Sequence, residues 1–318
     1  MIHSDARGYG IGAELVQVQD GKERPIAYEF RSLTTAEKNY SKTLLSSGLS
    51  SLHDTPTAGH LGFAKTYDRI RRKYYRPVLY GSVRRCASHC REFQRWKSPP
   101  QLPPVQLHPI KLPDIPFPKS GIGLLGRFPV TRSGNRWIIV CTDYLTRFTP
   151  TKVVSTAEAT EIATFLVEDI ILRHGAPREM ISDRRRSFLS NIVKDINQLC
   201  QTSYILTTAY HSQTNCLTER FNKQLAGMLS IYVDVEQRNW DTILLFVTFA
   251  YNSAKQDTTR FSPFFLVHGR DIEIPLDVIL SYDTENHDDN YVQQLITRAE
   301  EARHLAKLHI LDVQAADK

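Results

Sequence analysis

The pattern of apolar and polar residues near the start of the chain predicts a β-hairpin. Apolar and polar side chains alternate over residues 11–19 (IGAELVQVQ) and again over residues 25–30 (PIAYEF). The segment between them, DGKER, begins with Asp20-Gly21, a dipeptide typical of tight hairpin turns. This pattern ends after Tyr40. Residues 41–52, which are rich in Ser and Leu, match neither neighbour and are interpreted as a join.

A second pattern, which follows a proline-rich stretch, predicts an α/β domain. Eight prolines lie between Pro99 and Pro118, so residues 99–118 can sustain neither helix nor sheet and are predicted to form a linker. Beyond this linker, short apolar runs predict strands, and apolar residues at helical spacing predict helices. The predicted strands cover residues 136–144, 178–183 and 203–208, and the predicted helices cover residues 156–177, 187–200, 215–235, 240–251 and 290–316.

The ends of two predicted helices carry further information. Thr156 is the predicted N-cap of the first helix, and Gly175 followed by Pro177 predicts its end. The last helix, residues 290–316, is charged and amphipathic. Its pattern fits a solvated surface helix or a contact with another domain or another copy of the chain, and the sequence leaves these alternatives open.

The composition indicates a globular protein with a polyanionic partner. The 318 residues are 41% hydrophobic and 23% charged, and the net charge is +6 with a pI of about 9.0. A positive excess of this kind favours nucleic acid as the partner. Five cysteines are too few for a disulfide scaffold, no signal peptide is evident, and no apolar run reaches the roughly 18 residues of a membrane span. We therefore expect the nucleus or the cytoplasm, with no secretion and no membrane partner.

Two acids, Asp183 and Glu219, have the spacing of a metal-binding pair. Asp183 ends a predicted strand, Glu219 lies early in a predicted helix, and 35 residues separate them. Two-metal phosphoryl transfer needs carboxylates that converge on two divalent cations about 3.5–4 Å apart. Asp and Glu supply the oxygen ligands that Mg²⁺ prefers. The spacing permits convergence but does not by itself distinguish this pair from two surface acids.

The segments around these acids resemble the retroviral and gypsy-type LTR-retrotransposon integrases. They are SDRRRSF and AYHSQTNCLTERFNK around the acids, GIGLLGRFPVTRSGNRWIIVCTDYLTRF before them and FAYNSAKQDTTRFSPFFLVHGR after them. The resemblance implies a ribonuclease H-like α/β core at residues 119–275, with a mixed five-stranded sheet and flanking helices, followed by an amphipathic helical extension at residues 276–318. It also implies that Asp183 and Glu219 are the second and third catalytic acids, that Mg²⁺ or Mn²⁺ is the cofactor if the chain is active, and that the reaction is DNA end processing and strand transfer.

The chain departs from the family pattern at the first acid. The family usually reads Gly-Ile-Asp where this chain reads Gly121-Ile122-Gly123, so one oxygen ligand is missing. Asp143 is a possible substitute, although an Asp at this place is common in the family without belonging to the triad. After Asp183 the family usually has a small or polar residue and then Gly, whereas this chain has arginines. These changes predict impaired catalysis, and whether the chain is an enzyme is left open here.

Residues 53–98 resemble the small His-His-Cys-Cys zinc-binding domain that precedes the integrase core. His53, His60 and Cys90 match three ligands, and Phe93 stands where the fourth ligand belongs. A structural zinc site is four-coordinate, so the resemblance predicts a degenerate site with weak or absent Zn²⁺. Cys86, one helical turn before Cys90, or His89 could close the ligand shell.

Residues 1–40 resemble the beginning of the retrotransposon ribonuclease H domain. Asp5 matches the first catalytic acid of that domain, and the remaining acids, which should follow Tyr40, are missing. A single acid cannot hold two metal ions, so this segment is interpreted as a truncated fragment.

Two hypotheses follow from different classes of function. In one, the chain is a metal-dependent polynucleotidyl transferase acting on element ends and target DNA, as a possible homo-oligomer. In the other, it is a non-catalytic, transposon-derived DNA-binding protein or a pseudogene product. In both, Lys223 and Arg184 are the candidate nucleic-acid contacts, because both are basic and lie close in sequence to the two acids.

Overall fold

The computed structural model describes residues 2–7, 10–19, 22–32, 50–71, 79–90, 112–207, 216–272 and 291–316. The chain divides into two compact units, Met1–Arg95 and Trp96–Lys318, which are described separately. Within the described part of the chain, no helix is long and apolar enough to cross a membrane.

The first unit begins with the predicted hairpin. Three antiparallel strands follow one another in the order β1-β2-β3, with β1 at Ile2–Arg7, β2 at Gly10–Gln19 and β3 at Lys22–Ser32. Gln19 pairs with Lys22 across the turn, so the hairpin predicted from the Asp-Gly dipeptide is confirmed. The unit continues with a short π-helical turn and two α-helices: η1 (Ser50–Asp54), α2 (Phe63–Arg71) and α3 (Leu79–His89).

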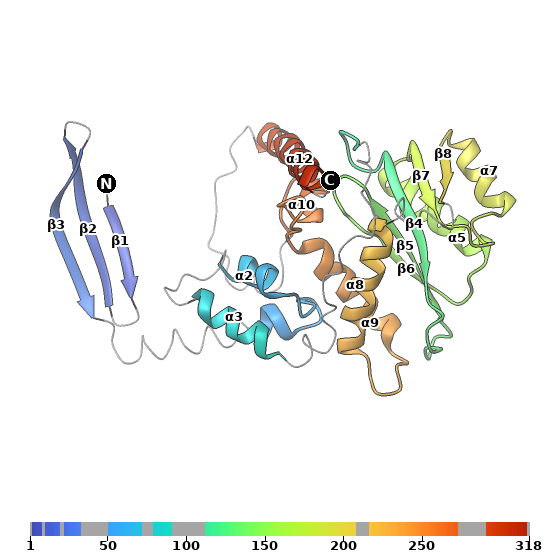
Figure 1. Ribbon diagram of the computed structural model, residues 1–318, viewed down its shortest axis with the longest axis horizontal. Helices are drawn as coiled ribbons and strands as arrows, with labels where there is room; N and C mark the ends of the chain where they lie inside the picture. Colours follow the sequence, from blue (N-terminus) through green and yellow to red (C-terminus); the bar gives the residue numbers. More distant parts are fainter. Residues whose placement is uncertain are drawn as a thin grey trace. The chain divides into compact units, whose positions relative to one another are not determined.

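The second unit is built on a mixed five-stranded sheet (Figure 1). Its strands are β4 (Lys119–Leu125), β5 (Trp137–Asp143), β6 (Thr151–Val154), β7 (Glu179–Ser182) and β8 (Ser203–Leu206). They lie in the order β6-β5-β4-β7-β8, with β4, β5 and β6 antiparallel and β4, β7 and β8 parallel. This is the ribonuclease H-like α/β core that the resemblance implied.

Helices cover both faces of this sheet (Figure 1). They are α5 (Ala159–Phe165), which continues through η2 (Leu166–Ile171) into α6 (Leu172–His174), then α7 (Asn191–Leu199), α8 (Cys216–Tyr232) and α9 (Trp240–Ser253). Two further helices, α10 (Pro263–His268) and α12 (Tyr291–Ala316), pack against each other, and α10 also contacts α9. On one face, Ile122 of β4 and Cys141 of β5 share a core with Ile162 of α5 and Val193 of α7. Gly123, whose neighbours lie on α8, belongs to the opposite face.

One predicted helix start is wrong. The helix expected to begin after Thr156 begins at Ala159, and Glu158 occupies the N-cap with extended backbone angles and no side-chain cap hydrogen bond. The Ala157 carbonyl accepts a hydrogen bond from Ser187 Oγ, a residue beyond β7. This tertiary contact holds the preceding residues outside the helix, whereas the N-cap rule considers only local sequence.

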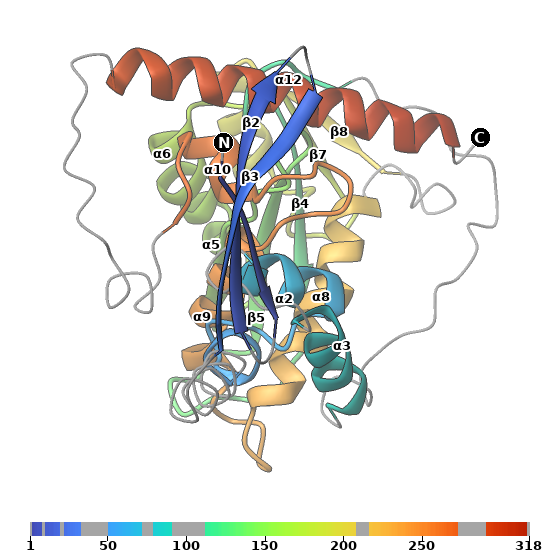
Figure 2. The same ribbon diagram turned by 90° about the vertical axis from the view of Figure 1, so that its left-hand side faces the viewer.

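The last helix, α12, packs onto the second unit instead of lying entirely in solvent. Figure 2 shows it lengthwise beside α10. Ala302 and Ala306 are buried against Leu266 of α10. Arg303 extends this contact, since its guanidinium Nε donates to the Leu266 carbonyl at 2.9 Å. This contact lies within the second unit, while Ile296, Leu305, Leu308, Leu311 and Val313 of α12 are exposed, so a further contact with another copy stays a prediction.

Candidate metal sites in the core and in the zinc-type module

Asp183 lies directly after β7, at the carboxyl end of a strand paired in parallel with both β4 and β8. Both of its carboxylate oxygens are engaged by one residue. The Arg185 backbone N–H donates to Asp183 Oδ1 at 3.0 Å, and Arg185 Nε forms an ion pair with Oδ2 at 3.2 Å. The same guanidinium lies 6.0 Å from the centre of the Trp137 ring. The Arg185 guanidinium is thus paired with the carboxylate that a metal ion would use.

Glu219 lies in the first turn of α8 and is exposed. Partial burial raises the pKa of Glu219, the nearby Lys223 ammonium lowers it, and the Asp183 carboxylate raises it. The two acids are therefore close enough for their charges to interact. The charges of Asp183 and Lys223 both act on Glu219, although Asp183 comes from a separate segment of the chain.

Gly123 lies on β4, opposite Val140 of β5, and its backbone faces α8. A Cβ atom built at this position would meet Thr218 Cγ2 at 3.1 Å and Asn222 Nδ2 at 3.6 Å. The position of the missing first acid therefore faces the first turns of α8, where Thr218 directly precedes Glu219. The Thr218 methyl group borders this position closely. Among the described residues, Thr218 Oγ1 and Asn222 Oδ1 are buried without a hydrogen-bond partner.

Asp143 is fully buried, and its hydrogen bonds stabilise the turn after β5. Its Oδ1 accepts from the Phe117 N–H at 3.0 Å, and its Oδ2 accepts from the Thr146 N–H at 2.9 Å and the Thr146 hydroxyl at 2.7 Å. Burial raises the pKa of Asp143, and these donors oppose that rise. With its oxygens committed to three donors, this carboxylate cannot also replace the missing ligand at Gly123.

The residues of the core do not fit a two-metal magnesium site as they stand. Mg²⁺ requires a near-octahedral set of oxygen ligands. Here the first acid is replaced by Gly123, and Asp183 is ion-paired with Arg185. Of the three family positions, only Glu219 keeps a carboxylate for which no hydrogen bond or ion pair within the described residues is recorded.

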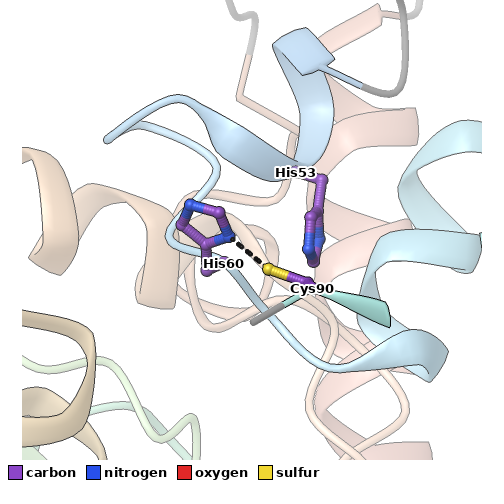
Figure 3. A group of neighbouring side chains, drawn as sticks. All are labelled: His53, His60 and Cys90. Carbon is purple, nitrogen blue, oxygen red and sulfur yellow. Dashed lines mark hydrogen bonds between the residues drawn. The ribbon is translucent and has the colours of Figure 1, made fainter. Parts of the chain in front are cut away.

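The zinc-type module, in contrast, gathers three ligand side chains (Figure 3). His53 comes from η1, His60 from the following turn and Cys90 from the end of α3. Their ligand atoms lie within 4.8 Å of one another, and His60 Nδ1 is 3.4 Å from Cys90 Sγ. The sequence prediction that these residues belong together therefore agrees with the geometry, and Phe93 lies outside the described residues.

His53 is held in the tautomer that binds a metal. The Thr66 hydroxyl donates to the Leu61 carbonyl at 2.9 Å, so its oxygen accepts from the N–H at Nδ1 of His53, 3.2 Å away. The lone pair then lies on Nε2, which is buried and has no hydrogen-bond partner among the described residues. Burial and the neighbouring His60 lower the pKa of His53, which favours the neutral ring. An oriented neutral imidazole with an uncommitted nitrogen fits zinc.

The two candidate nucleic-acid residues have different environments. Lys223 is exposed on α8, one turn after Glu219. Arg184 is exposed too, but its Nε donates to the Thr207 carbonyl at 3.0 Å, just past the end of β8. Residues 208–215, which precede α8, lie outside the described residues.

Sequence reasoning noted Arg185 as a departure from the family pattern, but it did not show the ion pair of Arg185 with Asp183, and it did not single out Thr218 or Asn222. Arg185, Thr218 and Asn222 act through contacts with Asp183 and with the space beside Gly123. A partial signal existed for Arg185, since it stands where the family usually has Gly. Thr218 and Asn222 are four residues apart on one helix, and that spacing alone does not show which strand they face.

Comparisons with known proteins agree with these observations. Residues 41–99 match the integrase zinc binding domain, and residues 1–46 match the RNase H-like domain found in reverse transcriptase. A zinc-binding domain of this family fits a metal-dependent protein in general terms.

Curated relatives extend the similarity into the core. The chain is 24% identical over 228 residues to the retrovirus-related Pol polyprotein from transposon 412 of Drosophila melanogaster, covering 71% of this chain and 18% of that protein. It is 24% identical over 223 residues to the gypsy retrotransposon integrase-like protein 1 of Homo sapiens, covering 70% of this chain and 42% of that protein. The chain thus spans less than half the length of these two relatives.

Among solved structures, the chain is similar to the simian T-cell lymphotropic virus intasome in complex with PP2A regulatory subunit B56 gamma. The identity is 14%, the match covers 69% of this chain and 77% of that chain, and the TM-score is 0.45. The matched domains and the curated relatives thus show that the chain is similar to integrase-like proteins and to Pol polyproteins of gypsy-type retrotransposons.

Proposed function

We propose that this chain is an integrase-like DNA-binding protein whose metal-dependent strand transfer is impaired. The observation that carries the proposal is that a glycine, Gly123, stands at the position of the first acid. The position that should supply the first carboxylate has none, and the Thr218 methyl group occupies the adjacent space. Strand transfer needs carboxylates that hold two cations together, and a protein that lacks one of them loses most of its transition-state stabilisation.

Arg185 supports the same conclusion independently. Its guanidinium provides Asp183 with a permanent positive charge, since arginine stays protonated at all physiological pH values. A divalent cation would have to displace this partner before it could bind. The exposed pair is weak in free-energy terms, so Arg185 lowers metal affinity without abolishing it.

The proposal is tested by restoring the site in two steps. Oligonucleotide processing and strand transfer are measured with Mg²⁺ and with Mn²⁺ for the unmodified chain, Gly123→Asp and Gly123→Asp/Arg185→Gly. We expect no product from the unmodified chain, little from the single variant and the most from the double variant. Gly123→Asp/Arg185→Gly/Asp183→Asn is the matched control and should be inactive. If the unmodified chain joins DNA as fast as the double variant, the proposal is wrong.

DNA binding is proposed from the excess positive charge and from the relatives. The basic side chains near the acids, Lys223 and Arg184, are exposed. Loss of one phosphate contact should reduce the slope of log affinity against log salt by about 1. We expect this for Lys223→Ala, and no change for Lys194→Ala, an exposed lysine on α7. An unchanged slope for Lys223→Ala would remove this residue from the interface.

We also propose that copies of the chain associate. Helix α9 exposes Leu245 at 71% and Phe246 at 49%, which is unusual for adjacent large apolar side chains. Light scattering after size exclusion should show an oligomer for the unmodified chain and a smaller species for Leu245→Lys. A monomer in both cases would contradict the association.

A further inference from the structure

We propose that Cys86 supplies the fourth zinc ligand of the His53, His60 and Cys90 cluster, in place of the family position that Phe93 now occupies. The ligand would then come from the turn of α3 before Cys90, instead of from the residues after it. The resulting site would be a His₂Cys₂ site whose two thiols are four residues apart on one helix.

The position of Cys86 on α3 carries the proposal. The Cys90 N–H donates to the Cys86 carbonyl at 3.0 Å, so helical geometry extends from one cysteine to the other. Residues four apart on a helix share a face, with Cβ atoms about 5–6 Å apart. The Cys86 thiol is not among the ligand atoms that lie within 4.8 Å of one another, so it would have to turn toward Cys90 to share an ion, which zinc would bind through sulfur at about 2.3 Å.

Burial shows that this shared face points inward. Leu79, Val83 and Ala87 are 4% exposed or less, and together with the half-buried Cys86 and Cys90 they form one continuous stripe along α3. Arg84, Arg85 and Ser88, on the remaining faces, are exposed. Cys86 therefore lies on the side of the helix that carries the third ligand.

The other candidate ligands are less suitable. His89 is exposed, and its Nδ1 is bonded to the Arg85 carbonyl at 2.9 Å, on its own helix. Asp54 lies with Oδ1 4.0 Å from His60 Nδ1, but its side chain is 52% exposed. Zinc in structural sites is held by Cys and His, so a half-buried thiol is favoured over an exposed carboxylate.

The state of His53 is a second and independent observation. Its Nε2 is a buried polar atom without a hydrogen-bond partner among the described residues, within 4.8 Å of the ligand atoms of His60 and Cys90. Leaving such an atom unsatisfied costs free energy. A bound ion would satisfy it. The number of further ligands then decides how tightly such an ion is held.

The test uses the full chain and Co²⁺, whose sulfur-to-metal absorption increases with the number of bound thiolates, followed by competition with Zn²⁺. For the unmodified chain we expect one tightly bound ion with the absorption of two thiolates, and release of the protons of both thiols. For Cys86→Ala we expect about half of that absorption and at least about tenfold weaker Zn²⁺ binding. Cys86→His should recover affinity but keep the one-thiolate absorption.

Controls separate ligation from misfolding. Cys200→Ala removes a half-buried cysteine at the C-cap of α7 and should leave the spectrum unchanged. Circular dichroism of each variant establishes that the helices persist. The proposal fails if Cys86→Ala binds Zn²⁺ and absorbs as the unmodified chain does. It fails equally if Asp54→Asn weakens binding tenfold while Cys86→Ala does not, or if the unmodified chain binds no ion.

Discussion

Replacement of Asp143 by Asn is the perturbation that most sharply separates a structural acid from a substitute catalytic acid. The Asp143 carboxylate is 0% exposed and accepts three hydrogen bonds, one at Oδ1 and two at Oδ2. An asparagine has the same shape but offers only one acceptor oxygen. Whichever way the amide is turned, its NH₂ group meets a donor.

The magnitude follows from that geometry. If the NH₂ group faces the Phe117 N–H, one hydrogen bond is lost; if it faces Thr146, two are lost. Each such bond to a charged group contributes about 1.5–3 kcal/mol, and donors left buried add a desolvation cost. We therefore expect Asp143→Asn to lower the free energy of unfolding by about 2–4 kcal/mol, in the better of the two orientations.

Urea unfolding of the second unit, followed by the fluorescence of Trp137 and Trp240, measures this change. Asp183→Asn is the matched control, because Asp183 is 36% exposed and its ion pair with Arg185 is a surface one. The control should change stability by less than about 1 kcal/mol. If the free energy of unfolding of Asp143→Asn lies within about 0.5 kcal/mol of that of the unmodified chain, the structural role is refuted. Asp143 would then again be a candidate metal ligand.

Three further predictions concern the same unit. Burial, with His268 and Arg173 nearby, lowers the pKa of His174 from 6.5 to about 4. The free energy of unfolding that neutral His174 contributes is therefore fully present above pH 6.5 and is lost as the pH falls toward 4. His174→Gln should flatten that dependence, which we expect to be about 1–2 kcal/mol after allowance for partial exposure. Asn252→Ala removes an amide that accepts from the Thr149 N–H at 2.9 Å and donates to the Thr149 carbonyl at 3.1 Å, and should cost about 2–3 kcal/mol in urea unfolding. Ser262→Ala removes the N-cap of α10, whose hydroxyl oxygen accepts from the Phe265 N–H at 3.1 Å, and should cost about 1 kcal/mol.

Each of these predictions has a matched surface control. The exposed residues His304, Asn191 and Ser133 offer His304→Gln, Asn191→Ala and Ser133→Ala. A pH profile for His174→Gln that is as steep as that of the unmodified chain would contradict the histidine argument. For the other two pairs, equal stability of the test variant and its control would show that the hydrogen bonds contribute nothing.

Three of the five core strands and most of the helices could be predicted from the sequence because they depend on local periodicity, whereas β4, β6 and α10 were not predicted from it. Val140 and Cys141 lie in an uninterrupted apolar run, as expected for a strand covered on both faces, and both are buried. Phe221 and Leu225 are four apart on α8 and are buried as that spacing predicted. Such periodic patterns depend only on residues that are close in sequence, so they can be recognised without knowing the tertiary contacts.

The state of the core site could not be predicted in the same way. The contact between Gly123 and Thr218 joins a strand to a helix far along the chain, and nothing in either local sequence records which residues meet. The engagement of Asp183 by Arg185 depends on the turn between them. The misplaced start of α5 has the same cause, since a tertiary hydrogen bond to the Ala157 carbonyl outweighs the capping preference of Thr156.

The surroundings of Gly123 also bear on how the first acid could be regained over generations. A single base change turns a glycine codon into one for an acidic residue, so the genetic distance back to an acid is short. A new carboxylate at this position would need the Thr218 methyl group, 3.1 Å from the position of the added Cβ atom, to shift by a few tenths of an ångström, and its partner acid Asp183 would still be ion-paired with Arg185. Under the proposed function, a change at the Gly123 codon would therefore regain part of the site, and a second change at the Arg185 codon would regain more. The route back to an acidic site would then pass through an intermediate that is partly restored.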